Sequence, residues 1–281
     1  MTSKSGLLLI HCAVLLFGLA GLFGKTIDLS SLQITWGRTF FASISLGIAI
    51  RYASHSFRVE RSHIPVFLVM GVLLAAHWWT FFHAIQISTV AIGLLSFAGF
   101  PIVVILLEPL FEDIPFQPSN LFYALLTMGG VFLVLPEISW ESRLTMGGVW
   151  GLISGALYGV VTLINRKFIS QYSALTIGFW QYLIACAALT FGLFQDSVPT
   201  GPEELIELVI LGIIFTALAH GLFIQGMKTV SATTASLIGA LEPVYGVTSA
   251  AIILSEFPSM RTVIGGSVVM LVVARISTKK P

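Results

Sequence analysis

Apolar runs long enough to cross a bilayer follow one another along nearly the whole 281-residue chain. A transmembrane helix needs about 20 predominantly apolar residues. Only 10% of the residues are charged, whereas soluble domains carry about 25%. We therefore predict an all-α integral membrane protein. Charges, prolines and polar clusters divide it into ten predicted transmembrane helices, at residues 5–24, 31–51, 63–85, 88–110, 119–136, 146–168, 173–194, 204–225, 231–254 and 259–276.

Composition also limits the classes of function. The first apolar run, residues 6–24, is longer than the roughly 7–15-residue core of a signal peptide, so we interpret it as the first span. Cys12 and Cys186 lie in apolar runs without a metal or redox spacing and are predicted to be free thiols. A net charge of +1 gives no indication of nucleic-acid binding. We predict no cofactor and no metal.

The placement of lysine and arginine predicts the orientation. Loops on the N-terminal side of the predicted spans hold ten of these residues, and the opposite loops hold three, which are Lys25, Arg143 and Arg261. Basic loops remain preferentially in the cytoplasm. We predict a multi-pass protein of the bacterial inner membrane with both termini cytoplasmic, as a monomer or a homodimer.

An internal repeat appears when the sequence is shifted by 141–142 residues, which divides the chain into residues 1–140 and 141–281. Each part holds five predicted spans, and an odd number inverts the second part relative to the first. Inverted repeats are typical of secondary transporters with a site near the midplane. The aligned positions are Phe17-Gly18 with Tyr158-Gly159, Lys25 with Arg166 or Lys167, Gly71 with Gly212, Trp78 or Trp79 with His220, Ala84 with Gly226, and Pro101 with Pro243.

This ordered set of residues resembles the ten-helix EamA-type branch of the drug/metabolite transporter superfamily. The resemblance rests on Phe17-Gly18, Lys25, Arg38, Pro101 and Glu112 in the first part, and on Tyr158-Gly159, Arg166, Glu242-Pro243, Glu256 and Gly265 in the second. It implies transport of small metabolites, often export of amino acids. Two departures make the parts chemically unequal: no arginine takes the place of Arg38 in the second, and Phe100 rather than glutamate precedes Pro101.

Glu242 is the most informative single residue. A carboxylate at membrane depth costs about 2.5–3.5 kcal/mol or more, so it must face a wet cavity, pair with a partner or carry a proton. Pro243 removes a backbone N–H and frees a carbonyl near Gly239. Glu242 is predicted to bind a substrate ammonium, to carry a proton, or only to fix the kink. Pro101 and Pro243 are the predicted gating hinges.

Aromatic residues and histidines gather in the third predicted span, LLAAHWWTFFHAI. His77, Trp78 and Phe81 share one helical face, and Trp79 with His83 share another. The first face is predicted to line an aromatic cavity, with packing against lipid or core as the alternative. His220 is its approximate repeat partner, and a satisfied core histidine is the alternative there. Further predicted cavity residues are Phe97, Phe100, Tyr158 and Tyr245.

Two basic residues are predicted to have structural or coupling roles. Lys25 follows the aromatic-glycine pair at the end of the first span. Arg38 lies about seven residues into the second span, where it could snorkel toward the interface, pair with Glu242, or bind a substrate carboxylate. Gly129-Gly130 and Gly265-Gly266 predict close helix contacts in the last span of each part.

We predict a secondary transporter working by alternating access, with amino acids or related metabolites as substrates. No GxxxxGK[ST] motif is present, so energy would come from a proton or substrate gradient, or movement would be facilitated diffusion. Amphipathic cations and nucleosides remain alternative substrates. An intramembrane enzyme lacks paired acids beside HWWTFFH, and a channel lacks a filter-like loop, so we predict neither.

Overall fold

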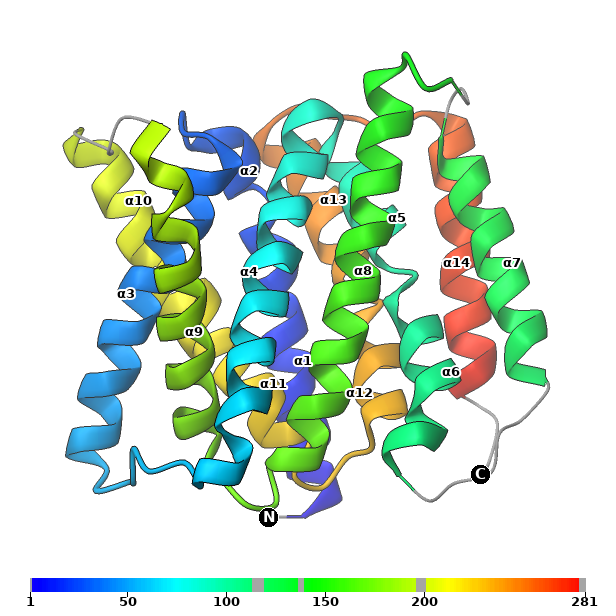
Figure 1. Cartoon of the computed structure of the whole chain (residues 1–281). Coiled ribbons are helices and arrows are strands. Elements are labelled where there is room, and N and C mark those ends of the chain that lie inside the picture. The colour runs from blue at the N-terminus through cyan, green and yellow to red at the C-terminus, as the bar shows by residue number, and fades with distance from the viewer. Residues whose placement is uncertain (1, 113–118, 136–138, 196–200, 278–281) are drawn as a thin grey trace.

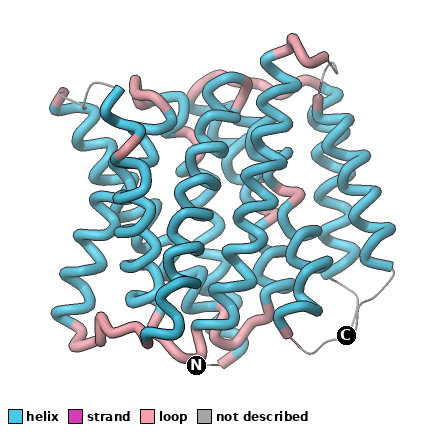
Figure 2. The backbone as a smooth tube through the Cα atoms, viewed as in Figure 1, coloured by secondary structure: helices cyan, strands magenta, loops and turns pink. Residues whose placement is uncertain are grey.

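Helices account for all regular secondary structure in the residues that the computed structural model describes, which are 2–112, 119–135, 139–195 and 201–277 (Figure 2). The helices before residue 136 are α1 (Ser3–Ala20), α2 (Phe23–Thr26), α3 (Ser31–Tyr52), η1 (Arg61–His63), α4 (Ile64–Ile87), α5 (Val90–Phe97), α6 (Phe100–Phe111) and α7 (Ser119–Val134). Those after it are α8 (Arg143–Phe168), α9 (Ala174–Thr190), η2 (Gly192–Gln195), α10 (Pro202–Gly212), η3 (Ile213–Leu218), α11 (Ala219–Gly226), α12 (Ala232–Gly239), α13 (Glu242–Ile253) and α14 (Met260–Ser277).

These helices are long and apolar enough to make the chain an integral membrane protein. Six of them, counted with the short helices that continue them, contain an 18-residue window with a mean hydropathy of 1.4 to 2.6. The apolar stretches of α9 and α14 are shorter. The all-α membrane class predicted from the sequence is confirmed.

Hydroxyl side chains begin several helices directly after short turns. Ser30 caps α3 by accepting a hydrogen bond from the Gln33 N–H, and Thr89 caps α5 by accepting one from Ile92. Ser231 begins α12 in the same way. Each cap satisfies a backbone donor that has no partner within its own helix. The polar turns in the sequence therefore separate neighbouring antiparallel helices with few residues.

Two helical rods are interrupted midway. α5 ends at Phe97 and α6 begins at Phe100, with Pro101 at its second position. α12 ends at Gly239 and α13 begins at Glu242, with Pro243 at the same place. A proline lacks the N–H that would continue the ladder from the preceding helix. Both interruptions lie where the sequence predicted them, and their use as gating hinges stays a prediction.

The helices pack into a central group with a pair at one side. α4 lies along α8 and α9, α3 lies along α9, and α1 contacts α11 and α13 (Figure 1). α7 and α14 run together at the edge of the bundle. There, a methyl group on Gly265 would lie 2.7 Å from the Gly130 carbonyl oxygen, so these glycines permit the close contact. Gly129 has nothing within 4 Å, so the prediction that it shares this contact was wrong.

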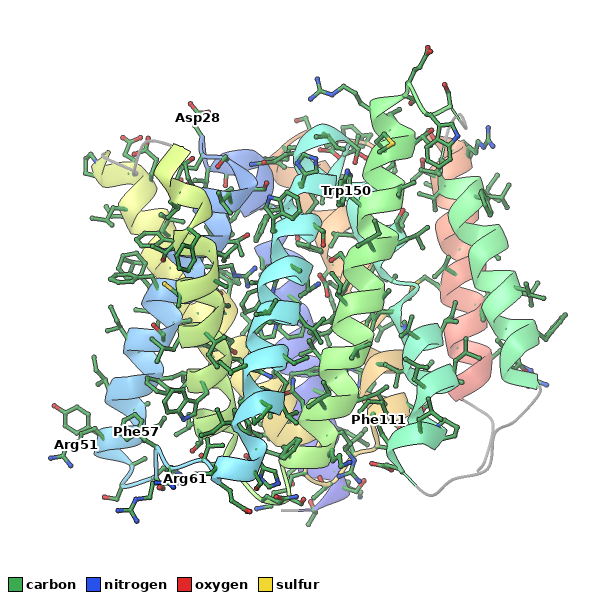
Figure 3. All side chains as sticks on the ribbon, in the orientation of Figure 1. Asp28, Arg51, Phe57, Arg61, Phe111 and Trp150 are labelled. Atoms are coloured by element: carbon green, nitrogen blue, oxygen red, sulfur yellow. The ribbon has the colours of Figure 1, made fainter. Side chains whose placement is uncertain are left out.

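Labelled charged residues lie at both ends of the bundle (Figure 3). α1 begins and α14 ends at the same end of the molecule (Figure 1). Arg51 and Arg61 lie at that end, whereas Asp28 lies at the opposite one (Figure 3). We call the end that holds Arg51 and Arg61 the N-terminal end. Its cytoplasmic location stays a prediction.

Candidate functional site

A small polar cavity lies at the centre of the bundle, where side chains from seven helices converge. Its volume is about 20 Å³, which is room for about one water molecule. The helices that line it are α1, α3, α4, α5, α8, α11 and α13. The lining residues are Phe17, Ala20, Arg38, His77, Trp78, Phe81, Phe97, Tyr158, His220 and Glu242.

The interrupted rod delivers Glu242 to this cavity. The residue stands in the first turn of α13 and is only 4% exposed. The positive end of a helix dipole stabilises a carboxylate at that position. The two ion pairs found among the described residues, Glu60–His63 and Glu112–Arg166, do not involve Glu242. Its carboxylate therefore faces the cavity without a paired cation in direct contact.

Arg38 supplies a positive charge to the same cavity and is 2% exposed. Its Nε donates to Thr216 Oγ1 at 2.8 Å, and its Nη2 donates to the Phe215 carbonyl oxygen at 3.2 Å. The guanidinium carbon lies 4.2 Å from the centre of the Trp78 ring, a cation–π distance. Hydrogen bonds from α3 to η3 therefore hold the charge within the bundle, and the alternative that Arg38 snorkels to the interface was wrong.

His77 is fixed from the neighbouring helix α8. Its Nδ1 lies 2.8 Å from Ser154 Oγ, which in turn donates to the His77 carbonyl oxygen at 3.0 Å. The Tyr158 ring stacks on the imidazole at 4.7 Å between centroids, and the Phe97 ring lies at 5.4 Å. Ser154 thus fixes the His77 side chain, which forms part of an aromatic wall of the cavity.

His220 completes the wall from α11. Its ring lies 4.3 Å from Phe17 and 4.9 Å from Trp78, measured between centroids. Phe81, which follows Trp78 by almost one turn of α4, contacts Phe97 at 5.4 Å. Histidines from α4 and α11 therefore face one aromatic-walled space together with one carboxylate and one guanidinium. Among the described residues, no group of three or more histidine, cysteine, aspartate or glutamate side chains could hold a metal ion.

The sequence matches the EamA-like transporter family twice, over residues 4–135 and 145–278. This chain belongs to the EamA-like transporter family. It is 24% identical to the uncharacterized transporter YxxF of Bacillus subtilis over 82% of this chain and 76% of that protein. It is 25% identical to an uncharacterized transporter of Archaeoglobus fulgidus over 93% and 92% of the two chains.

Two further likenesses span almost the whole of this EamA-family chain. The pseudopaline exporter CntI of Pseudomonas aeruginosa is 23% identical over 99% of this chain and 96% of its own. A protein of known crystal structure superposes with a TM-score of 0.73 at 20% identity, covering 99% of this chain and 97% of that chain. At that identity the superposition supports the fold.

Some residues predicted for the site of this EamA-family protein lie outside the cavity lining. Phe100 is buried behind it, with its ring 5.1 Å from that of Phe97. Tyr245 lies against α1, where a methyl group on Gly18 would approach its Cβ to 2.7 Å. Lys25 is near the end opposite the N-terminal end, and its Nζ donates to the Ser88 carbonyl oxygen at 2.8 Å. These three residues support the fold around the cavity rather than line it.

Several residues at the cavity were missed by the sequence analysis. Phe17 was used as a landmark of the repeat and of the family resemblance but not as a cavity residue, although it lines the cavity, as does Ala20 almost one turn later. Ser154 and Thr216 bind His77 and Arg38 but stand in apolar helices without a distinguishing pattern. For Phe17, the matched position of Tyr158 in the repeat was the available signal.

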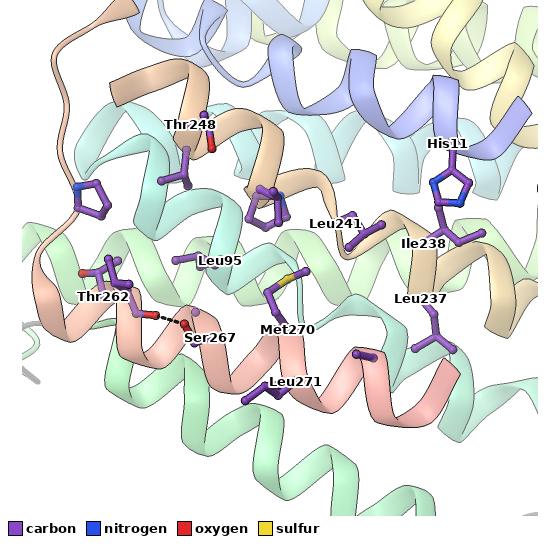
Figure 4. A pocket seen from close by; sticks show the side chains of 17 residues that line it. His11, Leu95, Leu237, Ile238, Leu241, Thr248, Thr262, Ser267, Met270 and Leu271 are labelled. Carbon is purple, nitrogen blue, oxygen red and sulfur yellow. Dashed lines mark hydrogen bonds between the residues drawn. The ribbon is translucent and has the colours of Figure 1, made fainter. Parts of the chain in front are cut away.

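A separate apolar groove, of about 830 Å³, lies between α12, α13 and α14 (Figure 4). Leu237, Leu241, Met270 and Leu271 are among the side chains that line it. Its single histidine, His11, comes from α1. Pro243 lines this groove while the adjacent Glu242 lines the cavity, so the interruption in the rod separates a polar space from an apolar one.

Proposed function

We propose that this EamA-family chain is a secondary transporter that moves small metabolites by alternating access around the central cavity. The observation that carries the proposal is the meeting of two interrupted rods, α5–α6 and α12–α13, at a buried space holding Arg38 and Glu242. Discontinuous helices form the substrate and ion sites of many secondary transporters. Charged side chains inside a membrane also mark such pathways.

The architecture we propose is ten transmembrane helices in two inverted parts, residues 1–140 and 141–281. Matched helix contacts support it. A methyl group on Gly6 would lie 3.0 Å from the Gly226 carbonyl oxygen, and one on Gly147 would lie 3.1 Å from that of Ala84. The first contact joins α1 to α11, and the second joins α8 to α4. In the repeat, α1 corresponds to α8 and α11 corresponds to α4, so the two contacts are equivalent.

A second pair of contacts follows the same exchange beside the interrupted rods. A methyl group on Gly18 would lie 2.8 Å from the Glu242 carbonyl oxygen, and one on Gly159 would lie 3.2 Å from that of Phe100. α1 therefore meets α13 as α8 meets α6. The twofold match of the family, over residues 4–135 and 145–278, is independent support for two equivalent parts.

Two acid side chains connect the interrupted rods, one toward each end of the bundle, and we propose that these connections act as gates. At the N-terminal end, the Glu108 carboxylate accepts hydrogen bonds from the Thr233 N–H and hydroxyl. At the opposite end, Glu256 Oε1 accepts from the Val90 N–H at 2.6 Å. A space of about 20 Å³ cannot hold a metabolite, so binding requires one of these connections to open. This is the behaviour expected of an occluded carrier.

The cavity chemistry favours amino acids or related metabolites. Glu242 can accept an ammonium group or a proton, and the rings of Phe17, Trp78 and Tyr158 can enclose an apolar portion. Amphipathic cations are the second candidate because the same rings and carboxylate suit them. We propose export, coupled to protons, from a bacterial inner membrane with both termini in the cytoplasm. The relative named as an exporter supports that direction.

Solute counterflow in proteoliposomes tests the transport function. Vesicles preloaded with an unlabelled amino acid should accumulate the labelled one only when they contain the protein. The Glu242→Gln variant should reduce accumulation at least tenfold and flatten its pH dependence, because it replaces a titratable group that lines the cavity.

Tyr245→Phe is the matched control for the Glu242 variant. It alters a side chain three residues along α13 that lies outside the cavity lining, so accumulation should stay within about twofold of wild type. If Glu242→Gln keeps the wild-type rate and pH profile, Glu242 has no part in the mechanism. If no tested amino acid or amphipathic cation shows counterflow, the proposed substrates are wrong.

A further inference from the structure

An irregular turn distinguishes one helix of the second part from its counterpart in the first. The helix α10–η3–α11 contains a π turn at Ile213–Leu218, whereas α4 is α-helical from Ile64 to Ile87. Position counts between matched glycine contacts explain the difference. Fourteen positions separate Gly212 from Gly226, but thirteen separate Gly71 from Ala84. The second part therefore carries one inserted residue, and the π turn absorbs it.

The matched contacts establish which positions correspond. A methyl group on Gly212 would lie 3.0 Å from the Arg38 carbonyl oxygen in α3, and one on Gly71 would lie 3.2 Å from the Gln181 carbonyl oxygen in α9. Gln181 is therefore the counterpart of Arg38. Each α-helical residue adds about 100° of rotation. Without a bulge, an inserted residue would therefore turn either Gly212 away from α3 or Gly226 away from α1.

The π turn changes which backbone groups are available. The Ala219 N–H donates to the Ile214 and Thr216 carbonyl oxygens, not to that of Phe215, which would be its partner in an α-helix. The Phe215 carbonyl oxygen instead accepts from Arg38 Nη2. Thr216 Oγ1 accepts from Arg38 Nε and donates to the Leu211 carbonyl oxygen at 2.7 Å. The turn thus supplies two acceptors to one guanidinium.

The corresponding place in the first part lacks both components. α4 offers no displaced carbonyl, and Gln181 Nε2 donates instead to Asn165 Oδ1 of α8 at 2.6 Å. The π turn and the arginine therefore occur together, whereas the unbroken helix occurs with a glutamine. This co-occurrence indicates that the inserted residue and Arg38 act together as one binding arrangement.

We propose that the inserted residue of α10–η3–α11 creates a docking site for Arg38, and that the docked guanidinium selects solutes carrying a carboxylate. Two of its five N–H donors bind Thr216 and Phe215, so donors remain for an anion in the cavity that Arg38 lines with Glu242. A planar guanidinium suits bidentate recognition of a carboxylate. The solute class rests on the proposed transport function, whereas the docking site does not.

A double-mutant cycle on thermal unfolding of the purified protein tests the docking site without any substrate. Arg38→Gln removes the donor, and deletion of the exposed Ile214 removes the extra residue. Each change alone strands one partner and should lower the unfolding midpoint. The double variant places a glutamine beside a helix without the inserted residue, as Gln181 stands beside α4, so it should recover at least half of the summed loss.

Matched controls separate this coupling from general damage. Deletion of the exposed Val72 removes a residue from the regular helix α4, and Arg38→Gln should give no recovery there. Thr216→Val should lower the midpoint, whereas Thr216→Ser, which keeps the hydroxyl, should stay near wild type. Additive losses in the Ile214 cycle would overturn the docking site, whatever the transport results are.

The solute class is tested with the double variant in counterflow. Wild type should prefer an α-amino acid over its decarboxylated amine by about tenfold or more, because a polar site rejects an analogue that leaves it unpaired. The double variant should lose most of this preference while still showing a cooperative thermal unfolding transition. Equal preference in both proteins would overturn selection by Arg38 even if the docking site holds. Absence of counterflow by wild type with any solute would instead count against the proposed transport function.

Discussion

At the scale of single residues, the cavity depends on hydroxyl groups that hold its polar side chains. Ser154 is fully buried, donates to the His77 carbonyl oxygen and has its remaining lone pairs available to the His77 ring. We predict that Ser154→Ala lowers the free energy of unfolding by about 1 kcal/mol, a typical value for a buried hydrogen bond. Because the His77 ring would also lose its hydrogen bond to Ser154, the KM for counterflow should rise.

Ser45→Ala is the matched control for that prediction. The Ser45 hydroxyl donates only to Ala42 within its own helix and is half-buried. Its loss should change the free energy of unfolding by less than about 0.5 kcal/mol. Equal destabilisation by the two variants, with an unchanged KM for both, would mean that Ser154 does not position His77.

Residues of the site were predictable to the extent that their chemistry conflicts with a membrane. Glu242 and Arg38 are charged residues inside apolar helices, so the sequence alone drew attention to them. Thr216 and Ser154 were not predictable because small hydroxyls commonly bond to the backbone of their own helix. Their bonds to other helices depend on packing between distant segments, which no local pattern of the sequence encodes.

At the scale of elements, the two interrupted rods are joined at both ends of the cavity. Glu108 of α6 binds Thr233 of α12, and Glu256, three residues after the end of α13, binds Val90 of α5. Glutamine accepts such hydrogen bonds without a charge, and charged acceptors give stronger ones. We predict that Glu108→Gln favours opening at the N-terminal end and that Glu256→Gln favours opening at the opposite end.

Labelling of a cavity cysteine from each side of the membrane measures this effect. Ala20→Cys, in a protein whose Cys12 and Cys186 are replaced, provides the reporter at the cavity wall. Glu108→Gln should increase labelling by an impermeant thiol reagent from the N-terminal side, and Glu256→Gln should increase it from the other. Glu141→Gln, in an exposed turn, is the control. A shift toward the same side in both variants would contradict the assignment of these residues to opposite gates.

The element scale also shows where sequence reasoning stops. Proline positions predicted both interruptions because the missing N–H is a local property. The π turn was not predicted, although the register changed from 141 to 142 residues between Gly212 and Gly226. A register change records that one residue was inserted, but it does not show that the turn meets Arg38, which comes from the distant helix α3.

At the scale of the whole molecule, the paired contacts predict that equivalent substitutions in the two parts act alike. Gly6→Ala and Gly147→Ala would each place a methyl group against a hydroxyl, that of Thr229 or Ser88, and about 3 Å from a facing carbonyl oxygen. Overpacking of this kind costs about 1–3 kcal/mol. Both variants should therefore lower the thermal unfolding midpoint of the purified protein by similar amounts, whereas Gly129→Ala, which meets open space, should hold or raise it through helix propensity. A large loss in only one of the two variants would mean that the α1–α11 and α4–α8 contacts do not contribute equally to stability. The two parts would then be related in sequence but not in how their helix contacts stabilise the fold.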